Sequence, residues 1–122
     1  MFGLFQRPKL EATFTPSEAV SNEFTKEITL AGRLMLTNQG NDAQVTSVEM
    51  MIIAGFRRIP LEVPAGWTRF RLAKGEMKAD DVAWKRVLDS PLRAQAGELF
   101  VSAQDQKRGS WQWRLPFTFE LR

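Results

Sequence analysis

The carboxylates near the middle of the chain are the first residues whose types could do chemistry. Asp80 and Asp81 are adjacent, and Glu76 lies just before them. Paired carboxylates act as acid and base or as nucleophile when they converge across a cleft. Adjacent residues of a strand point to opposite faces, however, and a carboxylate at a helix start is a common cap. We therefore expect Asp80 or Asp81 to cap a short helix, and we predict no catalytic residue.

A second oxygen-rich stretch, NQGND at 38–42, brings Asn38, Asn41 and Asp42 together in the sequence. Such oxygens could ligate Ca²⁺, but one carboxylate carries little charge for a tight site and the spacing is not that of an EF-hand. Asn, Gly and Asp are also the residues that populate turns. The stretch predicts a turn between two strands, and we expect no metal site and no cofactor.

Composition removes several classes of chemistry. The 122 residues include no Cys, no His and no Tyr. Disulfides, Cys/His zinc sites and Ser-His-Asp or Cys-His catalysis therefore lack their residues. Hydrophobic residues make up 43% and charged residues 25%, as in an ordinary folded domain. The length suits one domain spanning 1–122, and the chemistry predicts that it is not an enzyme.

The beginning of the chain, MFGLFQRPK, bears on location. Its apolar patch is shorter than a secretion signal requires, and no stretch approaches transmembrane length. We therefore expect a cytoplasmic protein without integral membrane association. Phe2, Leu4 and Phe5 are expected to form a frayed end or a strand edge, with docking to a membrane or partner as the alternative.

Positive charge is concentrated in the second half of the chain. Residues 1–56 carry four Lys/Arg against six Asp/Glu, net −2, whereas residues 57–122 carry thirteen against eight, net +5. The best binding candidate is a basic group that includes one tryptophan: Arg57, Arg58, Trp67, Arg69, Arg71 and Lys74.

This basic group depends on strand pairing. If strands at 56–63 and 67–74 pair, the six side chains share one region that could bind phosphate, nucleic acid or an acidic protein surface. Trp67 could then stack on a base. The alternative is a solvated strand face, whose arginines keep a sheet edge soluble.

Alternating apolar and polar residues dominate the chain and predict strands. The predicted strands lie at 9–14, 25–38, 45–55, 57–64, 67–75, 97–104 and 109–122. Pro16 is expected to end the first strand, and Gly32 to mark a bulge or a close backbone approach. Pro60 and Pro64 confine their strand to a sheet edge or an irregular crossing. The strand at 45–55, apolar on both faces, is expected to be central and covered on both sides, or to meet a partner. About seven strands predict an antiparallel immunoglobulin-like β-sandwich.

Two stretches need separate treatment. ADDVAWKRVLDSP at 79–91 has apolar residues on one helical face and predicts a short helix, with a strand that points Val82, Trp84 and Leu88 inward as the alternative. In the closing stretch every odd position from Trp111 to Leu121 is apolar. We assign its middle residues to the core: Trp113, Leu115, Phe117 and Phe119. Trp111 borders a polar turn and is left open, and Pro116 predicts an edge or a bend.

Three features resemble the arrestin-like clan, and the sporulation-control proteins within it. They are TFTPSE followed by ITLAGRLML, then VTSVEMMI after a turn, then LPFTFELR near the end. Those proteins usually carry two sandwiches, whereas this chain has room for one. The resemblance implies a protein-binding scaffold without catalytic residues. We therefore expect a non-catalytic interaction or regulatory domain that binds a protein partner or self-associates. The alternative is binding of nucleic acid or an anionic surface through 57–74.

Overall fold

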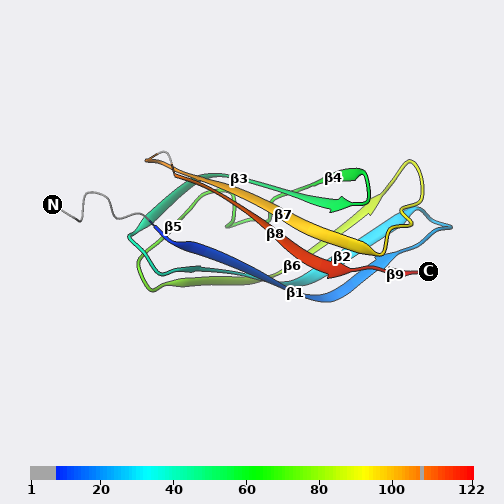
Figure 1. Ribbon diagram of the computed structural model, residues 1–122, viewed down its shortest axis with the longest axis horizontal. Helices are drawn as coiled ribbons and strands as arrows, with labels where there is room; N and C mark the ends of the chain where they lie inside the picture. The colour runs from blue at the N-terminus through cyan, green and yellow to red at the C-terminus, as the bar shows by residue number, and fades with distance from the viewer. Residues whose placement is uncertain (1–7, 108) are drawn as a thin grey trace.

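Two facing β-sheets make up residues 8–107 and 109–122, the part of the chain that the computed structural model describes (Figure 1). One sheet has four strands in the order β6-β2-β1-β9, and the other has five, β4-β3-β7-β8 with β5 also paired to β3. The strands are β1 (Leu10–Ser21), β2 (Glu27–Asn38), β3 (Ala43–Ala54), β4 (Arg57–Leu61), β5 (Phe70–Leu72), β6 (Met77–Val87), β7 (Ala96–Asp105), β8 (Ser110–Thr118) and β9 (Glu120–Leu121).

The all-β prediction is confirmed, and the sheets form a sandwich around one apolar core. The described residues form nine strands, not about seven, and the short β9 runs parallel to the end of β1. Among these residues there is no helix that is long and apolar enough to cross a membrane. The predictions made for Phe2, Leu4 and Phe5 lie outside the described residues.

The short helix predicted within 79–91 is wrong, because Met77–Val87 form β6. This strand pairs with β2 in one register from end to end, without a bulge. Its inward side chains Val82 and Trp84 are buried, with 5% and 8% of their surface exposed. A short apolar run fits both periods, so the hydrogen bonds offered by β2 and the two buried anchors decide in favour of the strand.

Pro16 does not end the first strand, because β1 continues to Ser21 past a register shift between Pro16 and Glu18. Gly32 lies opposite Pro16 at this bulge. A Cβ at Gly32 would overlap the carbonyl oxygen of Thr15 and come within 2.7 Å of the Phe14 ring. The predicted close approach at Gly32 is therefore confirmed, and glycine is required there for lack of space.

The predictions made for β3 and β4 of the five-stranded sheet are confirmed in part. β3 is central, and β4, which contains Pro60, is at an edge, both as predicted. The inward residues Met50, Ile52 and Ala54 of β3 are buried, whereas Met51 and Ile53 on its other side are half-buried. The expected cover on both faces is therefore incomplete on the outer face of this sheet.

The closing stretch forms β8 at the edge of the five-stranded sheet, as Pro116 predicts, and then crosses to the other sheet as β9. Its later inward residues are buried: Leu115, Phe117 and Phe119. Trp113, which was assigned to the core, is half-buried like Trp111 and packs against the core from its margin. An edge strand leaves one flank of a large ring without a neighbour, which accounts for this difference.

Candidate functional site

The six residues predicted to share a basic region are divided between opposite ends of β3. Arg57 on β4 lies opposite Ala54, whereas Arg71 on β5 lies opposite Gln44. Positions 44 and 54 are ten residue steps apart along β3, which corresponds to roughly 33 Å in an extended strand. The expected pairing between the strands at 56–63 and 67–74 does not occur. The structure therefore does not bring the six residues together.

Arg57 is held by the segment that follows β6. Its Nη2 lies 3.1 Å from Oδ1 of Asp89, and its Nη1 donates to the carbonyl oxygens of Ser90 at 2.8 Å and Pro91 at 3.4 Å. These contacts tie the β3–β4 hairpin to the 89–91 segment. Arg58, the next residue, is exposed. Arg57 is therefore a fixed structural anchor, whereas Arg58 is accessible to a ligand.

Trp67 is part of the core, with 2% of its surface exposed. Its Nε1 donates to Oδ2 of Asp80 at 2.8 Å, and the ammonium of Lys78 lies 5.0 Å from its ring centroid. The ring of Phe70 packs edge-on against it at 5.7 Å. Stacking on a nucleic-acid base requires an exposed ring face, so Trp67 does not offer such a platform.

Arg71 and Lys74 converge on Asp42. Oδ2 of Asp42 lies 3.2 Å from Nη2 of Arg71, and Oδ1 accepts the backbone N–H of Lys74 at 3.0 Å. The backbone N–H of Lys74, followed by the Arg71 guanidinium, holds the pKa of Asp42 below its usual value. The carboxylate joins the 38–42 turn to the loop after β5. Binding of an anionic partner thus stays a prediction. It now concerns two separate groups, Arg57 with Arg58 and Arg69 with Arg71 and Lys74, and Arg69 is exposed.

The 38–42 stretch is a turn, as predicted, and Asn38 organises it. Its side chain is buried, and Oδ1 accepts the N–H groups of Lys9 at 3.2 Å and Gly40 at 3.0 Å. Its Nδ2 donates to the carbonyl oxygens of Asn41 at 2.7 Å and Leu72 at 2.9 Å. The amide thus joins three segments of backbone. In residues 8–107 and 109–122, no group of three or more His, Cys, Asp or Glu side chains could hold a metal ion.

The carboxylates singled out in the sequence do not converge. Asp80 accepts the Trp67 bond, whereas Asp81 lies on the other face of β6 with Nη1 of Arg33 at 3.5 Å. Glu76 accepts the N–H of Ala73 at 2.7 Å and closes its own loop. Acid–base catalysis by paired carboxylates needs both groups at one cleft, and these three side chains do not form such a pair.

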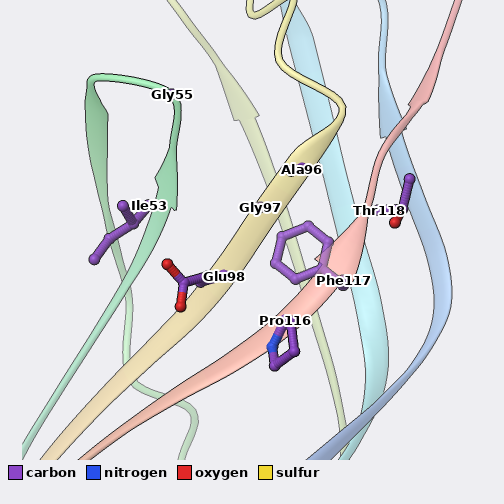
Figure 2. A pocket seen from close by; sticks show the side chains of 8 residues that line it. All are labelled: Ile53, Gly55, Ala96, Gly97, Glu98, Pro116, Phe117 and Thr118. Atoms are coloured by element: carbon purple, nitrogen blue, oxygen red, sulfur yellow. The ribbon is translucent and has the colours of Figure 1, made fainter.

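A shallow hollow of about 570 Å³ lies on the outer face of the five-stranded sheet (Figure 2). Ile53, Glu98 and Pro116 form a row across β3, β7 and β8 at its floor. The Phe117 ring lies beside the backbone of Gly97, where a Cβ would come within 2.9 Å of it. Glu98 is the one titratable side chain in the lining, so the hollow offers no acid–base pair.

Large apolar side chains are exposed at one end of the sandwich, and the sequence analysis missed them. Phe24 is 89% exposed, Phe56 is fully exposed at 107%, and Leu121 is 42% exposed. The β1–β2 turn, the β3–β4 turn and β9 that carry them lie at the same end of the molecule (Figure 1). We call these three residues the apolar end. A lone phenylalanine in each polar turn, in SNEFTK and in GFRR, was the available signal.

Local sequence holds both phenylalanine-bearing turns. Oδ1 of Asn22 accepts the N–H groups of Phe24 at 2.9 Å and Thr25 at 3.1 Å. Ala54 lies opposite Arg57, so the β3–β4 turn has two residues, and Gly55 adopts the φ of 59° that such a hairpin requires. Each phenylalanine therefore projects from a turn whose backbone is set by its neighbours.

Comparison with known proteins relates the chain to others through its fold. No protein-family model and no curated protein matches the sequence. The structure is similar to that of ApaA from Bordetella pertussis, with a TM-score of 0.59 and 19% identity over 93% of this chain and 94% of that one. It is also similar to Spo0M, a sporulation control protein from Bacillus subtilis, with a TM-score of 0.63 and 9% identity over 94% of this chain and 50% of that one.

These similarities show a shared β-sandwich. The expected likeness to sporulation-control proteins is confirmed at the level of the fold, and this chain spans half the length of the Spo0M chain. A third structure, the structural-genomics target SoR45, matches with a TM-score of 0.51 and 10% identity over 98% of this chain. Identities this low relate the folds alone, since one fold hosts many functions.

Proposed function

We propose that this chain is a non-catalytic interaction domain that binds a protein partner through the apolar end. The observation that carries the proposal is the exposure of Phe24 and Phe56, at 89% and 107%, on two turns from different sheets. Side chains in such positions bury no surface within the chain and so add little to its stability. Aromatic residues are enriched at the centres of protein interfaces.

The surroundings of the apolar end support this proposal. Ion pairs join Glu23 to Arg93 at 2.9 Å and Arg57 to Asp89 at 3.1 Å, beside the two turns that carry the phenylalanines. Protein interfaces combine an apolar centre with a polar rim. The partner that fits is a protein surface with an apolar pocket or groove for the phenyl rings, bordered by polar groups that meet these ion pairs.

We further propose that the chain is an arrestin-like scaffold with an immunoglobulin-like sandwich. The support is the match to Spo0M over 94% of this chain, together with the sequence features noted above. Spo0M is described as a sporulation control protein, and a regulatory role through protein contacts would suit a domain of this kind. A scaffold acts by presenting binding surfaces. Phe24 and Phe56 are exposed on turns whose backbone is fixed by neighbouring residues, which agrees with such a role.

Affinity capture with a paired variant tests the proposed function. The tagged chain and its Phe24→Ser/Phe56→Ser variant are used as baits in extracts of the native cell, and the captured proteins are quantified by mass spectrometry. We expect at least one protein to be captured by the wild type and lost with the variant, while both baits unfold at the same temperature. Reconstitution with that protein, purified, must then show the same loss of binding.

A matched control separates this loss from general loss of apolar surface. Met77 is 58% exposed and begins β6. The other end of β6, at Val87, pairs with Glu27 beside the β1–β2 turn, so Met77 lies away from the apolar end. The Met77→Ser variant should capture the same protein as the wild type. Equal capture by the wild type and the double-phenylalanine variant would refute the proposed function.

A further inference from the structure

β6 presents an unpaired backbone edge. It ends the four-stranded sheet and pairs with β2 alone. Just beyond its two ends, the N–H of Leu88 donates to the carbonyl of Lys26, and the N–H of Asn38 donates to the carbonyl of Glu76. In an antiparallel ladder hydrogen-bonded pairs alternate, so the even-numbered residues of β6 bond to β2. The N–H and C=O groups of the odd-numbered residues, from 77 to 87, point away from the sheet.

Within the described residues, nothing closes this edge. β4 and the segment that follows it contact β6 through two β6 side chains: Trp84 Nε1 donates to the carbonyl of Glu62 at 2.7 Å, and Arg86 donates to the carbonyl of Pro60. The described backbone hydrogen bonds include none from that segment to β6. β6 also has no proline and no bulge. A long, regular edge of this kind is a template for another strand.

The other long edge strand, β8, has a feature that opposes the addition of another strand. The N–H of Asp105 donates to the carbonyl of Gly109, and the N–H of Phe119 donates to the carbonyl of Gln95, so the odd-numbered residues of β8 bond to β7. Pro116 is even-numbered, and its missing N–H therefore lies on the free side. Proline in this position obstructs the addition of a strand, and β6 has no counterpart.

Charges along β6 are arranged to fit a second copy of the same strand. Asp80 and Asp81 precede Ala83, and Lys85 and Arg86 follow it at the mirrored positions. In an antiparallel pair centred on Ala83, Asp81 lies opposite Lys85 of the second copy. Asp80 lies opposite Arg86 in the same way, and two-fold symmetry repeats both pairs. Opposite charges directly across an antiparallel pair are stabilising.

Neighbouring registers lack this match. Centring on residue 81 places Asp81 opposite itself, and centring on residue 82 places Lys78 opposite Arg86. Centring on residue 84 places Asp81 opposite Val87. In the register centred on Ala83, by contrast, Val87, which is 67% exposed, lies opposite Ala79. The side chains of the Asp81–Lys85 pair are accessible, since they are 87% and 67% exposed. Asp80 and Arg86 already bond within the chain, to Trp67 and to the carbonyl of Pro60.

We propose that two copies of this chain associate through β6, antiparallel and centred on Ala83, so that two four-stranded sheets become one continuous sheet. The contact is isologous, because the same strand contributes to both sides. This inference goes beyond the proposed function and concerns a different surface. The strand pairing itself uses none of Phe24, Phe56 and Leu121, because these residues do not belong to β6.

Sedimentation velocity on a dilution series of the full chain at low salt tests the pairing. We expect a species of twice the 13.9 kDa of one chain. Asp81→Lys or Lys85→Asp places like charges opposite each other twice, so each variant should weaken association by about tenfold or more. Mixed in equal amounts, the two variants regain both opposite-charge pairs in the register centred on Ala83, and the mixture should associate.

Two further variants sharpen the result. Ala83→Pro removes an N–H on the free side and leaves the ladder to β2 intact, so it should abolish the pair. Arg114→Asp makes the same change of charge as Lys85→Asp on the exposed face of β8, and it should leave the pair unchanged. Circular dichroism must show that each variant is folded.

Three outcomes overturn the proposal. One is a wild-type chain that stays monomeric throughout the series, and another is a pair that survives both charge variants. The third is protection of the β6 amides from hydrogen exchange that requires a different protein, which would assign the edge to a strand of that protein. None of these outcomes bears on the apolar end, because no substituted residue belongs to it.

Discussion

The two ends of this sandwich are built differently. At the end that holds the 38–42 turn, buried polar side chains bond to backbone groups of separate segments: Asn38 makes four such bonds, and Asp105 accepts the N–H groups of Gln44 at 2.8 Å and Lys107 at 2.7 Å. At the apolar end, Phe24 and Phe56 project from short turns into solvent. Both ends contain side chains that tie separate segments, such as Asn38 at the first and Ser21 and Arg57 at the second, but large apolar side chains project into solvent at the second.

The difference shows how a small sandwich can separate stability from recognition. Turns leave backbone groups unpaired, and a buried amide such as that of Asn38 satisfies them. At the apolar end, Ser21 donates to the carbonyl of Leu92 at 2.6 Å, and the two turns are short and closed by Asn22 and Gly55. Its exposed residues are therefore open to selection for binding. Substitutions at the two ends should have opposite consequences for stability and for partner capture.

The largest expected effect contrasts buried and exposed phenylalanines near the same end. Phe119 lies between β8 and β9 and is 1% exposed. Phe119→Ala should lower the free energy of unfolding by about 3–5 kcal/mol, because it leaves a cavity in the core. Phe56→Ala should change it by less than about 0.5 kcal/mol. Urea denaturation measures both, and similar losses for the two variants would contradict the contrast.

The next effect concerns the end of the sandwich that holds the 38–42 turn, which we call the polar end. Asn38→Ala strands the N–H groups of Lys9 and Gly40 and two carbonyl oxygens, and we expect a loss of about 3 kcal/mol in urea denaturation. Asn41→Ala, in the same turn, is the control and should cost less than about 1 kcal/mol. If the two variants were equally stable, Asn38 would not be the organiser of this end.

A smaller effect compares the loss of stability at two aromatic residues of β8 that are buried to different extents. Trp113 is half-buried, so Trp113→Ala should cost about 2 kcal/mol, compared with about 3–5 kcal/mol for Phe117→Ala. Differential scanning calorimetry of the two variants gives the order. An equal or larger loss at Trp113 would place the tryptophan within the core, as the sequence suggested.

The smallest effect is a pH dependence at the polar end. The pKa of Asp42 is lowered from its usual 3.8 in the folded chain. Its contribution to stability is therefore fully present above that value and is lost as the pH falls through the lowered pKa. Asp42→Asn should reduce the melting temperature slightly at neutral pH, and the difference should vanish well below pH 3.8. A difference independent of pH would exclude the charge of Asp42 as the cause.

Several parts of the fold could be predicted from the sequence because they depend on local rules. Alternation predicted most strands, Pro60 and Pro116 predicted edge strands, and Gly32 predicted a close approach. The helix within 79–91 was wrong because a short apolar run satisfies two periods, and its partner β2 lies far away in the sequence. Local pattern carries no information about which strand supplies the hydrogen bonds.

The candidate sites were less predictable, for the same reason. Arg57 and Arg71 are close in the sequence, yet they lie at opposite ends of β3. Trp67 looked accessible among cations, but Asp80 and Phe70 enclose it in the core. Conversely, Phe24 and Phe56 are far apart in the sequence, and only the fold places the turns that carry them at the same end of the molecule.

The sequence by itself determined that this chain forms a β-sandwich, where its edge prolines lie, and that charges on residues 80–86 are mirrored about Ala83. The tertiary structure decided that β6 is an edge, that the basic residues are divided, and that phenylalanines gather at one end. The reason is physical. The direction of a side chain follows from its neighbours in the chain, whereas its burial and its contacts depend on strands that are distant in the sequence.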